Sequence, residues 1–384
     1  MVPSGWEKCT LENHINIKHG FAFKSEYFKS EGHYVLMTPG SFFETGGFKD
    51  QGIKTKYYIG EFPSNYLLKK GDLLLAMTEQ ATGLLGSAAL TPENDKFLHN
   101  QRLGLVRPIT PTRVSISFLY WLYNSPYIRK QISEQSTGTK VKHTSPDKLR
   151  GVTTLLPPLP EQRKIAQILS TWEKAISTTE YLIANSQQQK KSLMQQLLTG
   201  KKRFAGFVKE WEEVKLGDIS HITTGSSNRQ DSSLTGEFTF FDRSEDIRTS
   251  SRFLFDKEAV IVPGEGQDFA PKYFKGKFDL HQRTYAIMDF KGINGKFLYY
   301  YIDYFRHYLL SQAVGSTVKS LRLPMFKKMP LILPIIEEQR KIASALSAAD
   351  QEIDALKQKL SYLKQEKKSL MQQLLTGKRR VIIN

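Results

Sequence analysis

The sequence predicts a mixed α+β fold: two globular α/β-type domains joined by two long antiparallel coiled-coil helices, with the two halves related by an approximate two-fold axis. The first observation is a repeat: KKSLMQQLLTGK occupies residues 190–201 and again 367–378, and the same offset of 177 residues aligns EQRKIA at 161–166 with EQRKIA at 338–343. The second observation is a heptad pattern in both matched tails, which is typical of long packed helices. The residues between the tails hardly resemble each other, so one plan occurs twice with different middles.

Four segments follow from this repeat. The two divergent segments open alike, with WEKCTLENHINIKHG starting at Trp6 and WEEVKLGDISHITTG starting at Trp211. Each divergent segment is followed by one of the matched tails. We therefore expect a first divergent domain, a central helix, a second divergent domain and a C-terminal helix at residues 1–157, 158–200, 201–333 and 334–384, respectively.

Both tails are expected to be single helices. They lack glycine over residues 160–199 and 337–376, and each is closed by a glycine, Gly200 or Gly377, the residue type that favours a helix end. Apolar residues recur at spacings of four and three, which indicates a coiled-coil seam with the same register in both helices. The predicted seam residues are Ile165, Leu169, Trp172, Ile176, Ile183, Leu193, Leu197, Ile342, Leu346, Ile353, Leu356, Leu360, Leu363, Leu370 and Leu374.

Two further expectations concern the helix pair. Because the second helix starts where the second domain ends, an antiparallel arrangement closes the chain without a long linker, whereas a parallel one requires that domain to bridge the full helix length. Lys190 and Lys367 interrupt the seam at the same position in both helices. Their side chains either extend past a loosened helix end into solvent, which is the simpler interpretation, or contact another group.

A few elements can be placed inside the divergent domains. GDLLLAM at 71–77 and AVIVPG at 259–264 are short apolar runs that end at turn residues, as buried strands do. FLYWLYN at 118–124 and FLYYYIDYF at 297–305 indicate one amphipathic helix in each domain. Frequent glycine, serine and threonine elsewhere predict loops and tight turns, and they leave the topology open.

Composition limits the class of function. The 384 residues carry a formal net charge of +17, spread along the chain, which favours a polyanionic partner, nucleic acid before an anionic membrane; a solvated basic surface is the alternative. Cys9 is the single cysteine, so we expect neither a disulfide framework nor a thiolate zinc site. The sequence shows no apolar run long enough to span a membrane and no signal-peptide pattern, so we expect a soluble cytoplasmic protein.

Loops at equivalent places in the two halves are the candidate DNA-binding segments. STGTKVKH at 136–143 and VGSTVKSLR at 314–322 precede the helices and combine small, hydroxyl-bearing and cationic residues, which suit contacts to phosphates and base edges. TEQATG at 78–83 and EGQDFAPKY at 265–273 follow the apolar strands with polar side chains, which ordinary turn chemistry explains equally well. The candidate DNA-binding residues are Thr78, Gln80, Lys140, Lys142, His143, Gln267, Lys272, Ser316, Lys319, Ser320 and Arg322.

Two other features recur in both halves. A Gln-Arg step lies at residues 101–102 and at 282–283. Each helix is followed by a basic cluster, KKR at 201–203 and KRR at 378–380, which either stabilises the negative end of the helix dipole or contacts an anion. The sequence alone assigns neither feature to a site.

The common catalytic motifs are absent from the sequence. The chain has no GxxxxGK[ST] phosphate loop, no HExxH zinc motif, and only half of a GxGxxG pattern, at 264–269. The eight histidines do not cluster with acidic residues at metal-ligand spacing, and the Asp-Lys steps at 95–96 and 147–148 lack a further acidic partner. We therefore expect a binding protein with no catalytic residues, no metal site and no cofactor of its own.

The chain resembles the specificity (S) subunit of type I restriction–modification systems over nearly its full length. The resemblance rests on PLPEQRKIAQIL at 158–169 and LPIIEEQRKIASAL at 333–346, each followed by a long helix that ends in KSLMQQLLTGK. It implies two target recognition domains that each read one half of a bipartite site in double-stranded DNA, and helices that fix the spacer between the halves. The second unit departs from the pattern at 334–336, which puts only its helix start in doubt.

The resemblance also implies partners. Two modification subunits would dock on this chain and methylate adenine with S-adenosylmethionine, and restriction or translocase subunits would use ATP and Mg²⁺ in the same complex. Two other functions stay open from the residues themselves. The chain could be a stand-alone basic coiled-coil scaffold that binds nucleic acid without sequence choice. It could also be a membrane-surface protein, although a seam that packs on a second helix leaves no apolar face for lipid.

Overall fold

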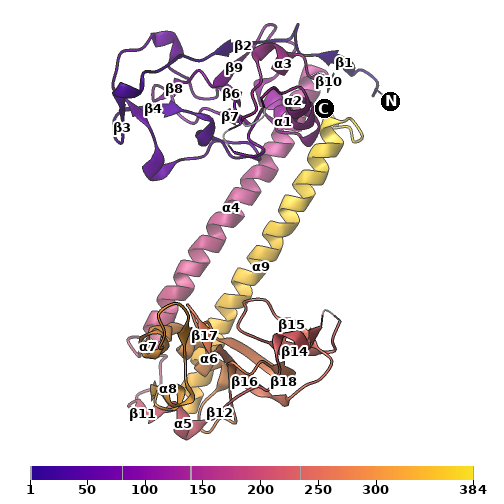
Figure 1. Ribbon diagram of the computed structural model, residues 1–384. Helices are drawn as coiled ribbons and strands as arrows, with labels where there is room; N and C mark the ends of the chain where they lie inside the picture. The colour runs from indigo at the N-terminus through magenta and orange to yellow at the C-terminus, as the bar shows by residue number, and fades with distance from the viewer. Residues whose placement is uncertain (1, 80, 139–140, 234, 384) are drawn as a thin grey trace. The chain divides into compact units, whose positions relative to one another are not determined.

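The chain forms two compact units, each with a β-rich domain (Figure 1). The computed structural model describes residues 2–79, 81–138, 141–233 and 235–383. Unit 1 comprises residues 1–178 and 360–384, and unit 2 comprises residues 179–359. Because the chain enters and leaves each unit along a long helix, each unit contains the start of one long helix and the end of the other. The predicted mixed α+β class is confirmed.

The two long helices are α4 (Leu159–Leu198) and α9 (Ile336–Leu375), each of 40 residues and therefore roughly 60 Å long. Gly200 and Gly377 lie two residues beyond them with φ of +69° and +67°, the left-handed conformation in which glycine ends a helix. Within each unit the segment of α4 packs antiparallel on the segment of α9, as the predicted arrangement requires. The predicted strands and helices in the divergent domains also form, as β6 (Leu73–Ala76), β16 (Phe255–Pro263), α1 (Ile116–Tyr123) and α6 (Gly295–Tyr304).

The lysines that interrupt the seam are paired inside the protein, so the prediction that they extend into solvent is wrong. Lys190 Nζ donates to Asp350 Oδ1 at 2.5 Å in unit 2. In unit 1, Lys367 Nζ donates to Glu173. The two lysine side chains are only 17% and 21% exposed. The two acidic residues share the 177-residue offset of the lysines, so each unit contains the same ion pair between the long helices.

The same lysines also contact their domains. Lys190 Nζ lies 5.4 Å from the ring centre of Tyr300, and Lys367 Nζ lies 4.9 Å from the ring centre of Trp121. Tyr300 Oη donates to Asp350 at 2.7 Å. A lysine over an aromatic face is attracted by the ring electrons. Each ion pair therefore fixes a helix of the domain, α6 (Gly295–Tyr304) or α1 (Ile116–Tyr123), against the long helices.

The predicted seam residues lie between the helices and in the domain cores. Those buried are Ile165, Leu169, Ile176, Leu197, Ile342, Leu346, Ile353 and Leu374. Those half-buried are Trp172, Ile183, Leu193, Leu356, Leu360, Leu363 and Leu370. The helix ends are buried most deeply, because the start of one helix and the end of the other enter the same apolar core in each unit. Burial of this kind stabilises by about 25 cal/mol per Å² of apolar surface.

The domain of unit 1 contains two four-stranded sheets, in the orders β2-β9-β6-β7 and β3-β5-β4-β8. The first sheet consists of β2 (Ile15–His19), β9 (Leu103–Pro108), β6 (Leu73–Ala76) and β7 (Ala88–Leu90). The second consists of β3 (Phe28–Lys29), β5 (Tyr57–Tyr58), β4 (Tyr34–Met37) and β8 (Phe97–His99). A further antiparallel pair, β1 (Glu7–Thr10) with β10 (Thr153–Leu156), leads into α4. Helices α2 (Pro126–Glu134) and α3 (Pro146–Arg150) complete the domain with α1.

The domain of unit 2 contains one seven-stranded sheet, in the order β12-β19-β16-β18-β14-β15-β13. Its strands are β12 (His221–Thr224), β19 (Thr284–Met288), β16 (Phe255–Pro263), β18 (Lys272–Leu280), β14 (Phe238–Phe241), β15 (Arg248–Ser250) and β13 (Ser232–Ser233). Two antiparallel pairs join β11 (Glu212–Lys215) to β21 (Pro330–Leu333) and β17 (Glu265–Gly266) to β20 (Lys319–Ser320). The helices are α5 (Leu216–Ile219), α6, α7 (Arg306–Gln312) and α8 (Leu323–Lys327).

The two domains share one strand order although their sheets differ in number. In unit 2 the long strand β18 pairs with β16 on one side and, in parallel, with β14 on the other. In unit 1 the place of β18 is taken by β7, which pairs with β6, and β8, which pairs in parallel with β4. An intervening segment at 91–96 separates these two short strands. The domains are therefore copies of one topology that have diverged in length and side chains.

In each unit one arginine of a basic cluster forms an ion pair with a buried carboxylate. In unit 2, Arg203 donates from Nε and Nη2 to the carboxylate of Glu338, at 2.9 and 2.7 Å. In unit 1, Arg380 donates in the same way to Glu161, at 2.7 and 2.9 Å, and Trp6 Nε1 donates to Glu161 at 2.9 Å. Both carboxylates are almost fully buried. The last arginine of each cluster therefore connects the end of one long helix to the start of the other.

Candidate nucleic-acid interface

In unit 2 the structure brings together the two loops that the sequence singled out. Strand β17 after the apolar strand β16 pairs with β20 before α8, with Glu265 opposite Ser320. Leu321 N then donates to Gly264 O at 2.8 Å, which extends the contact by one residue. The segment 314–320 closes on itself, because Val314 and Ser320 exchange two backbone hydrogen bonds of 3.0 and 2.7 Å.

Unit 1 repeats this arrangement with other side chains. Thr78 forms an antiparallel bridge with His143, and Thr144 N donates to Met77 O at 3.0 Å. Thr137 and His143 exchange backbone hydrogen bonds of 3.0 and 2.8 Å, as Val314 and Ser320 do in unit 2. We call this pair of loops in either domain the loop platform: residues 77–79 with 137–138 and 141–144 in unit 1, and 264–266 with 314–321 in unit 2.

Both loop platforms depend on a glycine at the same place. Gly138 and Gly315 have φ of +102° and +117°, a backbone conformation that strains other residues. A Cβ atom on Gly138 would lie 2.2 Å from Val141 O, and one on Gly315 would lie 2.3 Å from Val318 O. Any other residue would therefore force the loop open, and the Gly-x-x-Val spacing that the two segments share has a steric cause.

The candidate residues of unit 2 are mostly exposed. Gln267, Ser316, Lys319 and Arg322 lie at the surface, and Ser320 is half-buried in the loop platform. Lys272 differs, because its Nζ donates to Ser244 O at 2.6 Å inside the domain. Burial lowers the pKa of Lys272, while nearby acidic groups, Asp242 first, oppose the shift. Lys272 therefore holds the loop after β14 in place.

The candidate residues of unit 1 are arranged differently. Thr78 is buried, and its Oγ1 lies 3.4 Å from Nδ1 of the exposed His143. Lys142 is half-buried, with Nζ 3.3 Å from Ser133 Oγ. Gln80 and Lys140 lie outside the described residues.

The Gln-Arg steps lie next to the loop platforms, although the sequence analysis assigned them to no site. Arg102 O accepts from Met77 N at 3.0 Å, and Arg283 O accepts from Gly264 N at 2.9 Å. In both domains the step lies in the turn that leads into the strand beside the apolar strand, and its side chains are exposed. Their recurrence in otherwise unlike sequences was the signal that could have identified them.

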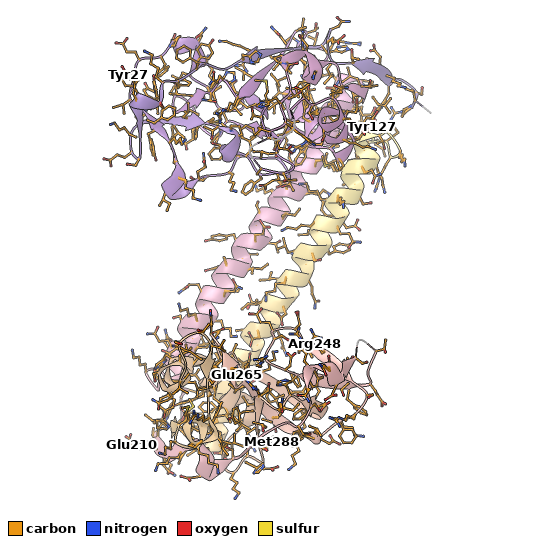
Figure 2. All side chains as sticks on the ribbon, in the orientation of Figure 1. Tyr27, Tyr127, Glu210, Arg248, Glu265 and Met288 are labelled. Carbon is orange, nitrogen blue, oxygen red and sulfur yellow. The ribbon has the colours of Figure 1, made fainter. Side chains whose placement is uncertain are left out.

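Unit 2 also contains a cluster of arginines and acids beside its loop platform. Figure 2 labels one member of this cluster, Glu265. Glu265 accepts from Arg243 on one carboxylate oxygen and from Arg283 on the other. A pocket of about 280 Å³ lies here, lined in part by Arg229, Asp242, Arg243, Glu265, His281 and Val318. Burial lowers the pKa of His281, and the positive charge of Arg243 adds to the shift. No local sequence pattern predicts this cluster, because its members come from segments that are far apart in the sequence.

One group of donor atoms was not foreseen. Glu7, Cys9 and His14 in unit 1 place their ligand atoms within 4.8 Å of one another. Glu7 and Cys9 share one face of the strand because they are alternate residues of β1. Glu7 already pairs with Arg113 at 2.8 Å. Burial, and then the charge of Glu7, raises the pKa of Cys9, which favours the thiol over the metal-binding thiolate. We therefore assign no metal to this group.

Among the residues that the structure describes, no helix has the length and apolar character needed to cross a membrane.

This architecture matches that of known proteins, in both sequence and structure. A family described as the type I restriction modification DNA specificity domain matches residues 3–185 and again 208–365. A putative type I restriction enzyme specificity subunit from Methanocaldococcus jannaschii, MjaX, is 27% identical and aligns over 83% of this chain and 80% of its own length. The EcoDI specificity subunit of Escherichia coli is 29% identical over 44% of this chain, and that match spans 37% of the E. coli protein.

Solved structures share the fold over the whole chain. The crystal structure of a type I restriction–modification S subunit from M. genitalium superposes with a TM-score of 0.68 at 17% identity, covering 97% of this chain and 96% of that one. A second structure, from work on complex assembly and conformational transition of the type I system, gives a TM-score of 0.59 at 18% identity and covers 99% of this chain. At these identities the likeness concerns the fold.

Proposed function

We propose, for a chain that belongs to the family of type I restriction modification DNA specificity proteins, that each of its two β-rich domains reads one half of a divided DNA site. It is the specificity subunit of such a system, which is a non-catalytic subunit. The observation that carries the proposal is the loop platform, which recurs in both domains with one backbone plan and different side chains.

The shared and the differing parts of the loop platform suit different roles. Phosphate contacts position a protein on DNA and carry no sequence information, whereas side chains that reach base edges specify the sequence. Lys142 and Lys319 occupy equivalent positions in the two domains, which favours contacts to phosphates. The side chains that differ, such as Thr78 opposite His143 and Glu265 opposite Ser320, favour a role in distinguishing bases or in holding residues that do.

The long helices are proposed to set the distance between the half-sites and to dock partners. Their ion pairs and apolar seam fix each domain against the helix pair, which a measuring device requires. Tyr181 and Tyr362 lie on these helices with 70% and 62% of their surface exposed, and Leu182 is 41% exposed. Exposed aromatic residues are enriched at protein interfaces. We propose that two modification subunits dock there and supply S-adenosylmethionine-dependent methylation, with ATP and Mg²⁺ used by restriction subunits.

Mapping of methylated adenines tests this function. The chain is expressed with the modification subunit of its system, in a host that lacks adenine methylation, and the modified positions are found by sequencing. We expect methylation at one motif made of two specific halves and a non-specific spacer. Co-purification with methylation at no motif, or at a single continuous motif, would contradict the proposal and favour a nucleic-acid-binding scaffold without sequence choice.

A further inference from the structure

The second domain contains an arginine pair that is not found among the described residues of the first domain. Glu265 is held between Arg243 and Arg283, and its side chain is only 15% exposed. The arginine side chains themselves are 46% and 59% exposed. Each guanidinium has five N–H donors, and the hydrogen bond to Glu265 leaves others available. One half-buried carboxylate thus fixes two partly exposed cations, and the three groups together carry a net positive charge.

This arginine pair lies on the loop platform. Glu265 pairs through its backbone with Ser320, and Arg283 accepts a backbone hydrogen bond from Gly264. Arg243 lies two residues beyond the end of β14 and lines the adjoining pocket of about 280 Å³. The second domain therefore presents Arg243 beside the loops that we propose contact DNA.

The shared strand order shows which members of the arginine pair are special to this domain. Arg283 has a counterpart in Arg102, since each follows a glutamine in the equivalent turn. The backbone oxygen of each arginine accepts a hydrogen bond from the first residue of its loop platform, Gly264 or Met77. Arg243 has none: β4 occupies the place of β14 in the first domain, and Pro39 stands two residues beyond its end. At the position of Glu265, the first domain has Thr78.

We propose that Arg243 is a specificity-determining residue of the second domain, which reads a guanine of the second half-site while Glu265 holds it in place. This inference rests on the proposed function. An arginine can donate two hydrogen bonds to O6 and N7 of guanine in the major groove. A carboxylate that already restricts the guanidinium reduces the side-chain conformational entropy that is lost on binding. Arg283 contacts the phosphate backbone, because a residue present in both domains suits what both half-sites have in common.

The test uses the complete complex with its methyltransferase partner. In the Arg243→Ala variant we expect one G·C position of the second half-site to become degenerate in the methylation map, while the first half-site is unchanged. Binding to the wild-type site should fall about tenfold or more, the loss typical of one bidentate base contact. Arg243→Lys should not restore the preference, since lysine lacks the planar fork. Arg283→Ala is the matched control and should weaken binding to all sites alike.

A base analogue separates base contact from loss of folding. 7-Deazaguanine lacks the N7 acceptor, and we place it at each guanine of the second half-site in turn. At one position the replacement should weaken binding of the wild-type complex several-fold. The same replacement should not weaken binding of the Arg243→Ala complex any further. A variant that keeps the wild-type motif at every position, or loses affinity equally for all sequences, overturns the inference. A wild-type map without two half-sites overturns the proposed function itself, so the two failures are distinguishable.

Discussion

Lengthening both helices by one heptad should lengthen the DNA spacer without changing either half-site. The perturbation duplicates residues 178–184 in α4 and the equivalent residues 355–361 in α9, which lie 177 positions apart. Because the heptad is repeated in both helices, the apolar seam is preserved. The ion pairs Lys190–Asp350 and Glu173–Lys367 lie on opposite sides of the insertions, so both are retained.

The size of the effect follows from helix geometry. Seven residues at 1.5 Å each add about 10 Å of helix and rotate one end relative to the other by only about 20°. At 3.4 Å per base pair this corresponds to a spacer longer by about three base pairs. The assay is the methylation map of the variant complex, compared with that of the wild-type chain.

A single-helix insertion is the matched control. Duplicating residues 355–361 in α9 alone shifts one helix past the other by about 10 Å, so one of the two ion pairs loses its partner. We expect that variant to lose stability and methylation. An altered half-site in the double insertion, or an unchanged spacer, would refute the reasoning that the helices measure and do not read.

Three other perturbations follow from the structure. Gly315→Ala should reduce DNA affinity at least several-fold with little change in melting temperature, because its Cβ meets Val318 O, whereas Gly206→Ala, with a positive φ but open space, should leave affinity unchanged. Lys319→Ala should lower the slope of binding against salt by about one if this lysine contacts a phosphate; an unchanged slope would exclude it. Burial lowers the pKa of His99 to about 4 from an ordinary 6.5, so the unfolding free energy should fall by about 3 kcal/mol as pH drops from 6.5 towards 4; urea titrations of the His99→Gln variant should lack this part of the decline.

The parts of the fold that the sequence predicted are those set by local patterns. Heptad spacing predicted the long helices and their seam, and two short apolar runs predicted β6 and β16. The sequence contains a sign of the partners of Lys190 and Lys367, since Asp350 and Glu173 are separated by the same 177 residues as the lysines. The pairing can be assigned only once the antiparallel register of the helices is known. A charge in a seam was therefore taken for a solvated one.

The sheets could not be predicted, because their pairings are short and distant in sequence. Strand β8 joins β4 in parallel across about sixty residues, and β18 does the same with β14 across about forty, with three residue pairs in each case. The arginine pair could not be predicted for the same reason. Arg243, Glu265 and Arg283 come from three separate segments, two turns and strand β17, that only the completed sheet brings together. The Gln-Arg steps were visible as a repeat but had no assigned place until the turns were known.

The exchange of one domain tests most directly the claim that each domain reads its own half-site. Residues 204–333 are replaced by the corresponding segment of a relative whose methylated motif is known, and the methylated adenines of the resulting complex are sequenced. The account predicts a motif that keeps one half-site of this protein and takes the other from the relative. A motif that changes in both halves, or in neither, would contradict it.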